Sequence, residues 1–338
     1  MLTMIMARTL RCPTDMCLNA GRPLQIRWPT MTPKLEAAEV TVTSQRPLDA
    51  ALTLSPHQRG PGDPAHRRTP DGAIWRVSRQ LSGPVTYRIT QSDRHTVRVQ
   101  SWGVGATEFL GGAEALLGLD DEADDFAPEH PKLAEAHRRF PHLRIGRTGR
   151  VMEALVPAIL EQRVHGVDAF AAWRRLLTKF GERAPGPAPD GMRVPLTADQ
   201  WRRMPSWEFH RANVDPARSK TIVQCARVAD RLEQASTFSR AEATRRLRAV
   251  PGVGIWTAAE VAQRAFGDSD ALSVGDYHLA AVVGWSLLGE PIDDARMVEY
   301  LAPLQPHRYR AVRLLQVSGQ AVKPKFGPRT AIADHRWH

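Results

Sequence analysis

The stretch VPGVGIWTA, residues 250–258, places two glycines between two segments of helical pattern. Glycine tolerates positive φ and has no side chain, so such a turn exposes backbone N–H groups where the second helix begins. Those N–H groups, together with the helix dipole, form a site for an anion such as a DNA phosphate. The pattern predicts a helix-hairpin-helix that holds a DNA backbone without reading its sequence. A tight turn between antiparallel helices has the same composition and stays an alternative.

The charge balance favours the nucleic-acid interpretation. Lys and Arg outnumber Asp and Glu by 46 to 36, which gives a formal charge of +10 and a pI near 10.1. This balance is typical of chains that bind polyanions, although a basic protein without such a partner has it too. Arg245, Arg246 and Arg248 lie just before the glycine turn. We therefore expect double-stranded DNA as the partner, bound by a monomer.

Cysteine usage and hydropathy exclude several classes. The three cysteines, Cys12, Cys17 and Cys225, have neither the number nor the spacing of a disulfide framework or a metal site. They fit a reducing compartment, so we expect a cytoplasmic, nucleoid-associated protein. No apolar run reaches the length of a membrane span, and we expect no membrane partner. We expect no cofactor and no metal held by side chains.

The first part of the chain has the pattern of an α+β domain. Residues 1–36 are an irregular extension, for which a start near Met31 is an alternative. In residues 37–118, apolar and polar residues alternate over Val40–Ser44, Val85–Thr90 and His95–Trp102, which predicts a small antiparallel sheet. Arg59–Gly72 is rich in breakers and is expected to be a loop. Residues 119–146 are predicted to be an acidic linker.

Residues 147–322 are predicted to form an all-α domain, followed by a basic tail at 323–338. Apolar residues recur at helical spacing over 148–181 and 216–232. Further helices are expected over about 255–266, 277–288 and 309–319. Helix starts are marked by Thr197-x-x-Gln200, Ser239-x-x-Glu242 and Asp215-Pro216.

Asp276 is the candidate catalytic residue. It follows a glycine at the start of an apolar helix, in SVGDYHLAAVVGW. Asp is a preferred N-cap, and a purely structural cap is the simpler interpretation. A carboxylate held near a sugar can also stabilise positive charge that develops at C1′ and orient a water.

Residues 247–285, LRAVPGVGIWTAAEVAQRAFGDSDALSVGDYHLAAVVGW, resemble the helix-hairpin-helix/Gly-Pro-Asp superfamily of DNA glycosylases. Within it the chain is most similar to the bacterial 3-methyladenine DNA glycosylase II, or AlkA, type, over about residues 37–315. The resemblance implies a TBP-like accessory domain at the N-terminus and a helix-hairpin-helix glycosylase domain after it. It implies that Asp276 is catalytic and that the hairpin contacts DNA phosphate through Gly252, Val253, Gly254 and Thr257. The hairpin carbonyls are expected to hold a monovalent cation.

The resemblance also assigns residues around the flipped base. Trp256 stands where lyase-active relatives keep a Schiff-base lysine, which implies no AP lyase activity. Its ring could stack on a cationic base or simply belong to the core. Gln162 and Arg163, in EALVPAILEQRV, fall on the pair that fills the gap left by the flipped nucleotide, although the AlkA type has leucine at the second position. An exposed helix end is the alternative for both. Tyr277 is expected to contact substrate.

The chain departs from the AlkA type in its expected pocket. Glu260 replaces an aromatic residue one turn after the tryptophan, and His307 replaces the tryptophan of a Pro-Trp-Arg segment. No four-cysteine cluster follows Asp276, so no iron–sulfur cluster is expected. The implied function is monofunctional excision of alkylated purines, 3-methyladenine and 7-methylguanine, from duplex DNA by base flipping and Asp-assisted hydrolysis. The alternatives are a non-catalytic DNA-binding or damage-sensing protein, and a glycosylase for deaminated or etheno bases.

Overall fold

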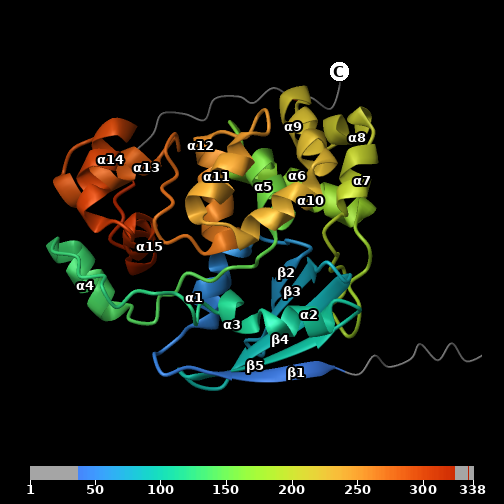
Figure 1. The fold of residues 1–338 in the computed structure, drawn as a ribbon, viewed down its shortest axis with the longest axis horizontal. Coiled ribbons are helices and arrows are strands. Elements are labelled where there is room, and N and C mark those ends of the chain that lie inside the picture. The colour runs from blue at the N-terminus through green and yellow to red at the C-terminus, as the bar shows by residue number, and fades with distance from the viewer. Residues whose placement is uncertain (1–36, 324–333, 335–338) are drawn as a thin grey trace, which may run out of the picture. The chain divides into compact units, whose positions relative to one another are not determined.

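The computed structural model describes residues 37–323 and residue 334, so the expectations for residues 1–36 and for nearly all of the tail lie outside the described residues. An antiparallel sheet of five strands forms the N-terminal part, in the order β1-β5-β4-β3-β2 (Figure 1). The strands are β1 (Ala38–Thr43), β2 (His66–Arg68), β3 (Ile74–Arg79), β4 (Pro84–Gln91) and β5 (Thr96–Trp102). The predicted small antiparallel sheet is confirmed, and the TBP-like label stays a prediction.

Alternation along the strands gives the sheet two buried faces. One face packs on α1 (Ala50–Leu54), α2 (Ala106–Gly111) and α3 (Ala113–Leu116), through a core that includes Tyr87 and Phe109. On the other face Trp75 and Trp102 stack with ring centroids 5.5 Å apart, and Met192 packs against them. The loop expectation for Arg59–Gly72 is wrong at β2, where His66–Arg68 pair with β3.

The first helical layer surrounds one apolar core that includes Leu155, Trp173 and Ile222. The predicted capping box at Thr197 and the Asp215 N-cap are both present. Ser239 also accepts a hydrogen bond from the Glu242 N–H, at 3.4 Å. The helices are α5 (Val151–Leu160), α6 (Gly166–Phe180), α7 (Ala198–Arg203), α8 (Ser206–Arg211), α9 (Pro216–Arg227), α10 (Ala229–Glu233), α11 (Arg240–Arg248) and α12 (Ile255–Val261).

A second helical layer has its own core, formed by α4 (Pro131–Arg139), α13 (Leu279–Val283), α14 (Asp294–Leu301) and α15 (Arg308–Ser318). Helix α4 lies within the segment expected to be a linker, and its Leu133 and Ala136 are buried in this core. Helices α12 and α13 continue as π-helical turns over Ala262–Phe266 and Gly284–Leu288. Short 3₁₀ turns cover Ser55–His57, Gln234–Thr237 and Ala302–Leu304.

None of the helices in the described part of the chain combines the length and the apolar character that a bilayer crossing requires. The domain boundaries at residues 118, 146 and 322 stay predictions.

A buried ion pair joins the second helical layer to the segment that follows the sheet. Arg310 of α15 donates to both carboxylate oxygens of Asp121, at 2.5 and 3.0 Å, and the two side chains are 2% and 3% exposed. Asp121 also accepts from the Ile145 N–H at 2.9 Å. A charge buried this deeply depends on its partner, because water cannot replace the lost contact.

We therefore expect Arg310→Met to lower the free energy of unfolding by about 3–5 kcal/mol, since it leaves a buried carboxylate unpaired. The control is Arg296→Met, which breaks the exposed Arg296–Glu299 pair of α14 and should cost no more than about 1 kcal/mol. Urea unfolding followed by circular dichroism measures both. Equal effects of the two substitutions would contradict the prediction.

Candidate active site

The two hairpin glycines have different structural roles. Gly252 has a φ of +90°, and a Cβ there would lie 2.1 Å from Oγ1 of Thr221 on α9. Gly254 has an ordinary φ of −86° and is the N-cap of α12. Among the described residues other than its chain neighbours, no heavy atom lies within 4 Å of a Cβ built on it. Gly252 therefore permits the close packing of the turn on α9. Gly254 leaves the N-terminus of α12 open to an approaching group.

The residue expected in the DNA gap, Gln162, holds the hairpin from the end of α5. Its side-chain amide donates to the Gly252 carbonyl at 3.0 Å and to the Thr257 hydroxyl at 2.8 Å. One of the carbonyls expected to face a cation thus already accepts a protein hydrogen bond. The next residue, Arg163, is exposed and has a φ of 55°, a left-handed backbone conformation uncommon outside glycine.

The Asp276 carboxylate divides its oxygens between two partners. Oδ1 accepts from the N–H groups of His278 and Leu279, at 2.9 and 3.0 Å, and so bonds the turn that leads into α13 (Leu279–Val283). Oδ2 accepts from Nε1 of Trp256 at 3.2 Å. Helix α13 begins at Leu279 with His278 at its N-cap position, so Asp276 bonds the turn ahead of the helix and is not the N-cap that the sequence predicts. The second oxygen of the same side chain faces α12.

One face of α12 and its π turn fixes the loop that leads to Asp276. Trp256, Glu260 and Gln263 are spaced at i, i+4 and i+7, which places them on the same side of a helix. The Gln263 amide donates to the Ala271 carbonyl and to the Ser273 hydroxyl, both at 2.8 Å. Ser273 in turn donates to Oε1 of Glu260 at 2.6 Å. We call Trp256, Glu260 and Gln263 the α12 face.

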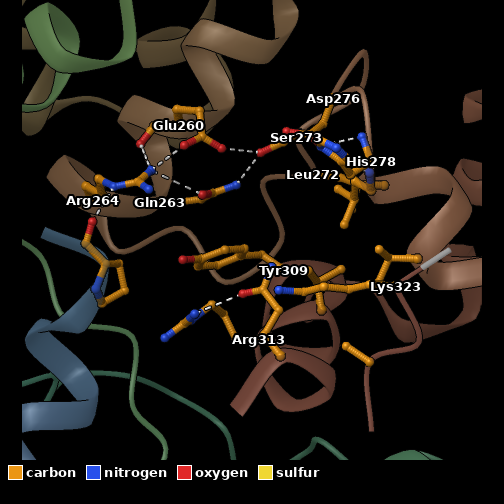
Figure 2. A pocket seen from close by; sticks show the side chains of 16 residues that line it. Glu260, Gln263, Arg264, Leu272, Ser273, Asp276, His278, Tyr309, Arg313 and Lys323 are labelled. Atoms are coloured by element: carbon orange, nitrogen blue, oxygen red, sulfur yellow. Dashed lines mark hydrogen bonds and ion pairs between the residues drawn. The ribbon is translucent and has the colours of Figure 1, made fainter. Parts of the chain in front are cut away.

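A cavity of about 740 Å³ opens beside this loop (Figure 2). Its volume lies in the range of small-molecule sites, and Asp276 is on its wall. Figure 2 shows Glu260, Gln263 and Arg264 along one side of it, with Tyr309 and Arg313 below them in that view. Among the described residues, neither Trp256 nor the 79% exposed Tyr277 belongs to the cavity lining.

Glu260 and Arg264 form an ion pair on the cavity wall. Arg264 Nη1 lies 2.7 Å from Glu260 Oε2, and its Nε donates to the Pro56 carbonyl of the N-terminal part at 2.9 Å. Burial favours the neutral acid of Glu260, but the Arg264 charge and the Ser273 hydroxyl outweigh it and lower its pKa. The carboxylate is therefore ionised at neutral pH.

Sequence reasoning missed Ser273, Gln263 and Arg264. The i, i+4 spacing of Glu260 and Arg264 is typical of an ion pair on a helix and could have predicted it. No local pattern indicates that Ser273 and Gln263 meet, because their hydrogen bond depends on how the loop folds back. Among the described residues, no group of three or more His, Cys, Asp or Glu could hold a metal ion.

Comparison with solved structures places this geometry in a known fold. A 3-methyladenine DNA glycosylase from Archaeoglobus fulgidus superposes with a TM-score of 0.69, at 17% identity, over 83% of this chain and 98% of that one. MBOgg1, in complex with a low-affinity DNA ligand, gives a TM-score of 0.66 at 16% identity, over 85% and 98%. The chain has the fold of the helix-hairpin-helix DNA glycosylases. The apo 8-oxoguanine glycosylase/lyase of Clostridium acetobutylicum is also similar, with a TM-score of 0.64 at 14% identity, over 83% and 97%.

Sequence comparison agrees with this helix-hairpin-helix glycosylase fold. The chain is 30% identical over 232 residues to the probable bifunctional transcriptional activator/DNA repair enzyme AlkA of Mycobacterium tuberculosis, in strains CDC 1551 and H37Rv. The match covers 64% of this chain and 44% of that protein, so the chain spans less than half the length of these curated relatives. No family model matches the chain. The resemblance indicated by the sequence is confirmed.

We expect Gly252→Ala to destabilise the protein by about 1–3 kcal/mol, because alanine disfavours positive φ and its Cβ would displace Thr221. Gly254→Ala is the matched control, since its φ and surroundings accept a methyl group; its effect should stay below about 1 kcal/mol. Thermal and urea unfolding measure both. The prediction is wrong if alanine is tolerated equally well at the two positions.

Proposed function

We propose that the protein is a DNA glycosylase that hydrolyses the N-glycosidic bond of alkylated purines, 3-methyladenine and 7-methylguanine, in duplex DNA. The observation behind the proposal is the position of Asp276. It lies on the wall of a cavity large enough for a purine, and it is hydrogen-bonded to Trp256, which follows the glycine hairpin. The name of the Archaeoglobus structure, a 3-methyladenine DNA glycosylase, supports the substrate class, and the name of the AlkA relatives supports a role in DNA repair.

In the proposed reaction the open N-terminus of α12 binds a phosphate of the damaged strand through Gly252, Val253, Gly254 and Thr257. The damaged nucleotide rotates out of the stack into the cavity. Gln162 and Arg163 fill the gap, and Tyr277 contacts the substrate strand. The partner is duplex DNA bound by one copy of the chain.

The chemistry of the leaving base explains how one carboxylate is enough to catalyse the hydrolysis. Alkylation at N3 or N7 gives the base a positive charge, so it leaves as a neutral molecule when the C1′–N bond breaks with its electron pair. The sugar becomes oxocarbenium-like, and the Asp276 carboxylate stabilises its charge. A water attacks C1′ and gives up its proton to Asp276 or solvent, which leaves an abasic site and the free base.

A second candidate function follows from the backbone contacts of Asp276. Since Oδ1 bonds the backbone N–H groups of His278 and Leu279 at the start of α13, Asp276 could have only this structural role, in a non-catalytic, damage-sensing DNA-binding protein. The two functions differ in what happens when the charge is removed but these contacts are kept.

We expect Asp276→Asn to keep the fold and the binding of abasic-analogue DNA, because Asn accepts backbone hydrogen bonds at a helix start about as well as Asp. Release of 3-methyladenine and 7-methylguanine from methylated duplex DNA should fall at least about a hundredfold, the effect of removing one electrostatic stabiliser. Base release by chromatography and DNA binding by fluorescence anisotropy are measured on the same samples. Binding without release by the wild type, also on deaminated and etheno-containing duplexes, would favour the non-catalytic function.

We expect no covalent complex with abasic DNA under borohydride, because Trp256 offers no amine for a Schiff base. The enzyme would then be monofunctional. Lys323 is the one lysine among the described residues that line the cavity, so Lys323→Ala is the control. A trapped complex on denaturing gels would contradict the prediction, and its loss in the control would identify the amine.

A further inference from the structure

Glu260 is the charged residue of the α12 face, and like Gln263 it lines the cavity. Its side chain is 13% exposed, and it lines the same cavity as Asp276. Figure 2 shows its carboxylate between Ser273 and Arg264, on the side that also holds Gln263. A flipped base in this cavity would therefore meet an ionised acid on one wall.

The bonding of Glu260 leaves it able to accept more hydrogen bonds. Among the described residues, each oxygen has one hydrogen-bond donor, Ser273 for Oε1 and Arg264 for Oε2. An ionised carboxylate offers about four acceptor positions, so about two remain. Arg264 holds the carboxylate in place. Its guanidinium donates to the Glu260 carboxylate and to the Pro56 carbonyl.

The ion pair is not explained by stability alone. Buried ion pairs are often replaceable by apolar residues of similar volume without loss of stability. A carboxylate that keeps its charge and unused acceptor positions on a cavity wall is instead suited to a ligand with N–H donors. Hydrogen bonds from such donors to an ionised group are stronger than those between neutral groups.

We propose that Glu260 determines specificity by selecting flipped bases that present N–H donors to the cavity wall. The inference rests on the proposed glycosylase function and narrows its substrate class. The exocyclic amine of 3-methyladenine and the N1–H and N2–H groups of 7-methylguanine qualify. 1,N6-Ethenoadenine has no N–H donor on its base in DNA, so it would leave the remaining acceptor positions of the carboxylate unfilled in a cavity from which the base excludes water, which is unfavourable for a charged group.

Glu260 also holds Ser273, so a structural role must be separated from a selective one. A residue that only positions the Asp276 loop would affect every base alike when it is changed. A residue that selects bases would change the ratio between a base with donors and a base without them. The two bases differ in how readily they leave the sugar, but this difference is the same for every variant. It therefore does not affect the comparison of the ratio between variants.

The test measures single-turnover release of 3-methyladenine and of 1,N6-ethenoadenine by the wild type, Glu260→Gln and Ser273→Ala. Inhibition by each free base, in the presence of abasic-analogue DNA, compares binding of the two bases without the chemical step; free 1,N6-ethenoadenine then has an N–H only at N9, the nitrogen that bears the sugar in DNA. We expect Glu260→Gln to lower the preference for 3-methyladenine by about ten- to a hundredfold, the range of one charge-assisted hydrogen bond. Ser273→Ala removes the loop contact but keeps the carboxylate, so it should slow both bases alike and leave the preference unchanged.

A proportional loss for both bases in Glu260→Gln, with an unchanged inhibition ratio, would overturn the inference while leaving the glycosylase function in place. An altered ratio in Ser273→Ala equal to that in Glu260→Gln would overturn it as well, because loop position would then set the preference. If the wild type releases no base from any damaged duplex, the proposed function fails and the inference fails with it.

Discussion

The loop that bears Asp276 is fixed from the α12 face, and the rest of the candidate site depends on that attachment. Trp256 bonds the carboxylate itself, while Gln263 bonds the loop at Ala271 and Ser273. Each hydrogen bond contributes only about 1 kcal/mol net, but together they fix the loop along its length. Position matters here because a displacement of about 1 Å at a reacting group can cost a hundredfold in rate.

In the proposed reaction the same helix joins phosphate binding to base binding. The N-terminus of α12 begins at Gly254, where the approach is open, and Gln162 braces the turn from α5. The C-terminal end of α12 and its π turn provide Glu260 and Arg264 to the cavity wall. Arg264 also bonds the Pro56 carbonyl, which ties this wall to the N-terminal part. A phosphate held at one end of α12 therefore lies at a fixed distance from the cavity at the other end.

Local patterns allowed part of this arrangement to be predicted. The capping box at Thr197 and the turn at Gly252 and Gly254 follow from short-range chemistry, and both are present. Strand β2 was missed because three residues inside a breaker-rich segment show no alternation; they form a strand through pairing with β3. The contact of Gln162 with the hairpin joins residues 90 positions apart along the chain. No pattern in one sequence specifies such a contact, because it depends on how α5 packs on α12.

The structural role and the proposed catalytic role of Asp276 are compatible because they use different oxygens of its carboxylate. The N–H groups of His278 and Leu279, just before and at the first residue of α13, bond Oδ1 and so orient the carboxylate. Oδ2 accepts only the 3.2 Å bond from Trp256 among the described residues, so it can accept a further hydrogen bond. A residue that is preorganised by its structural role needs no further ordering when a substrate arrives, which is the condition for electrostatic stabilisation of a developing charge.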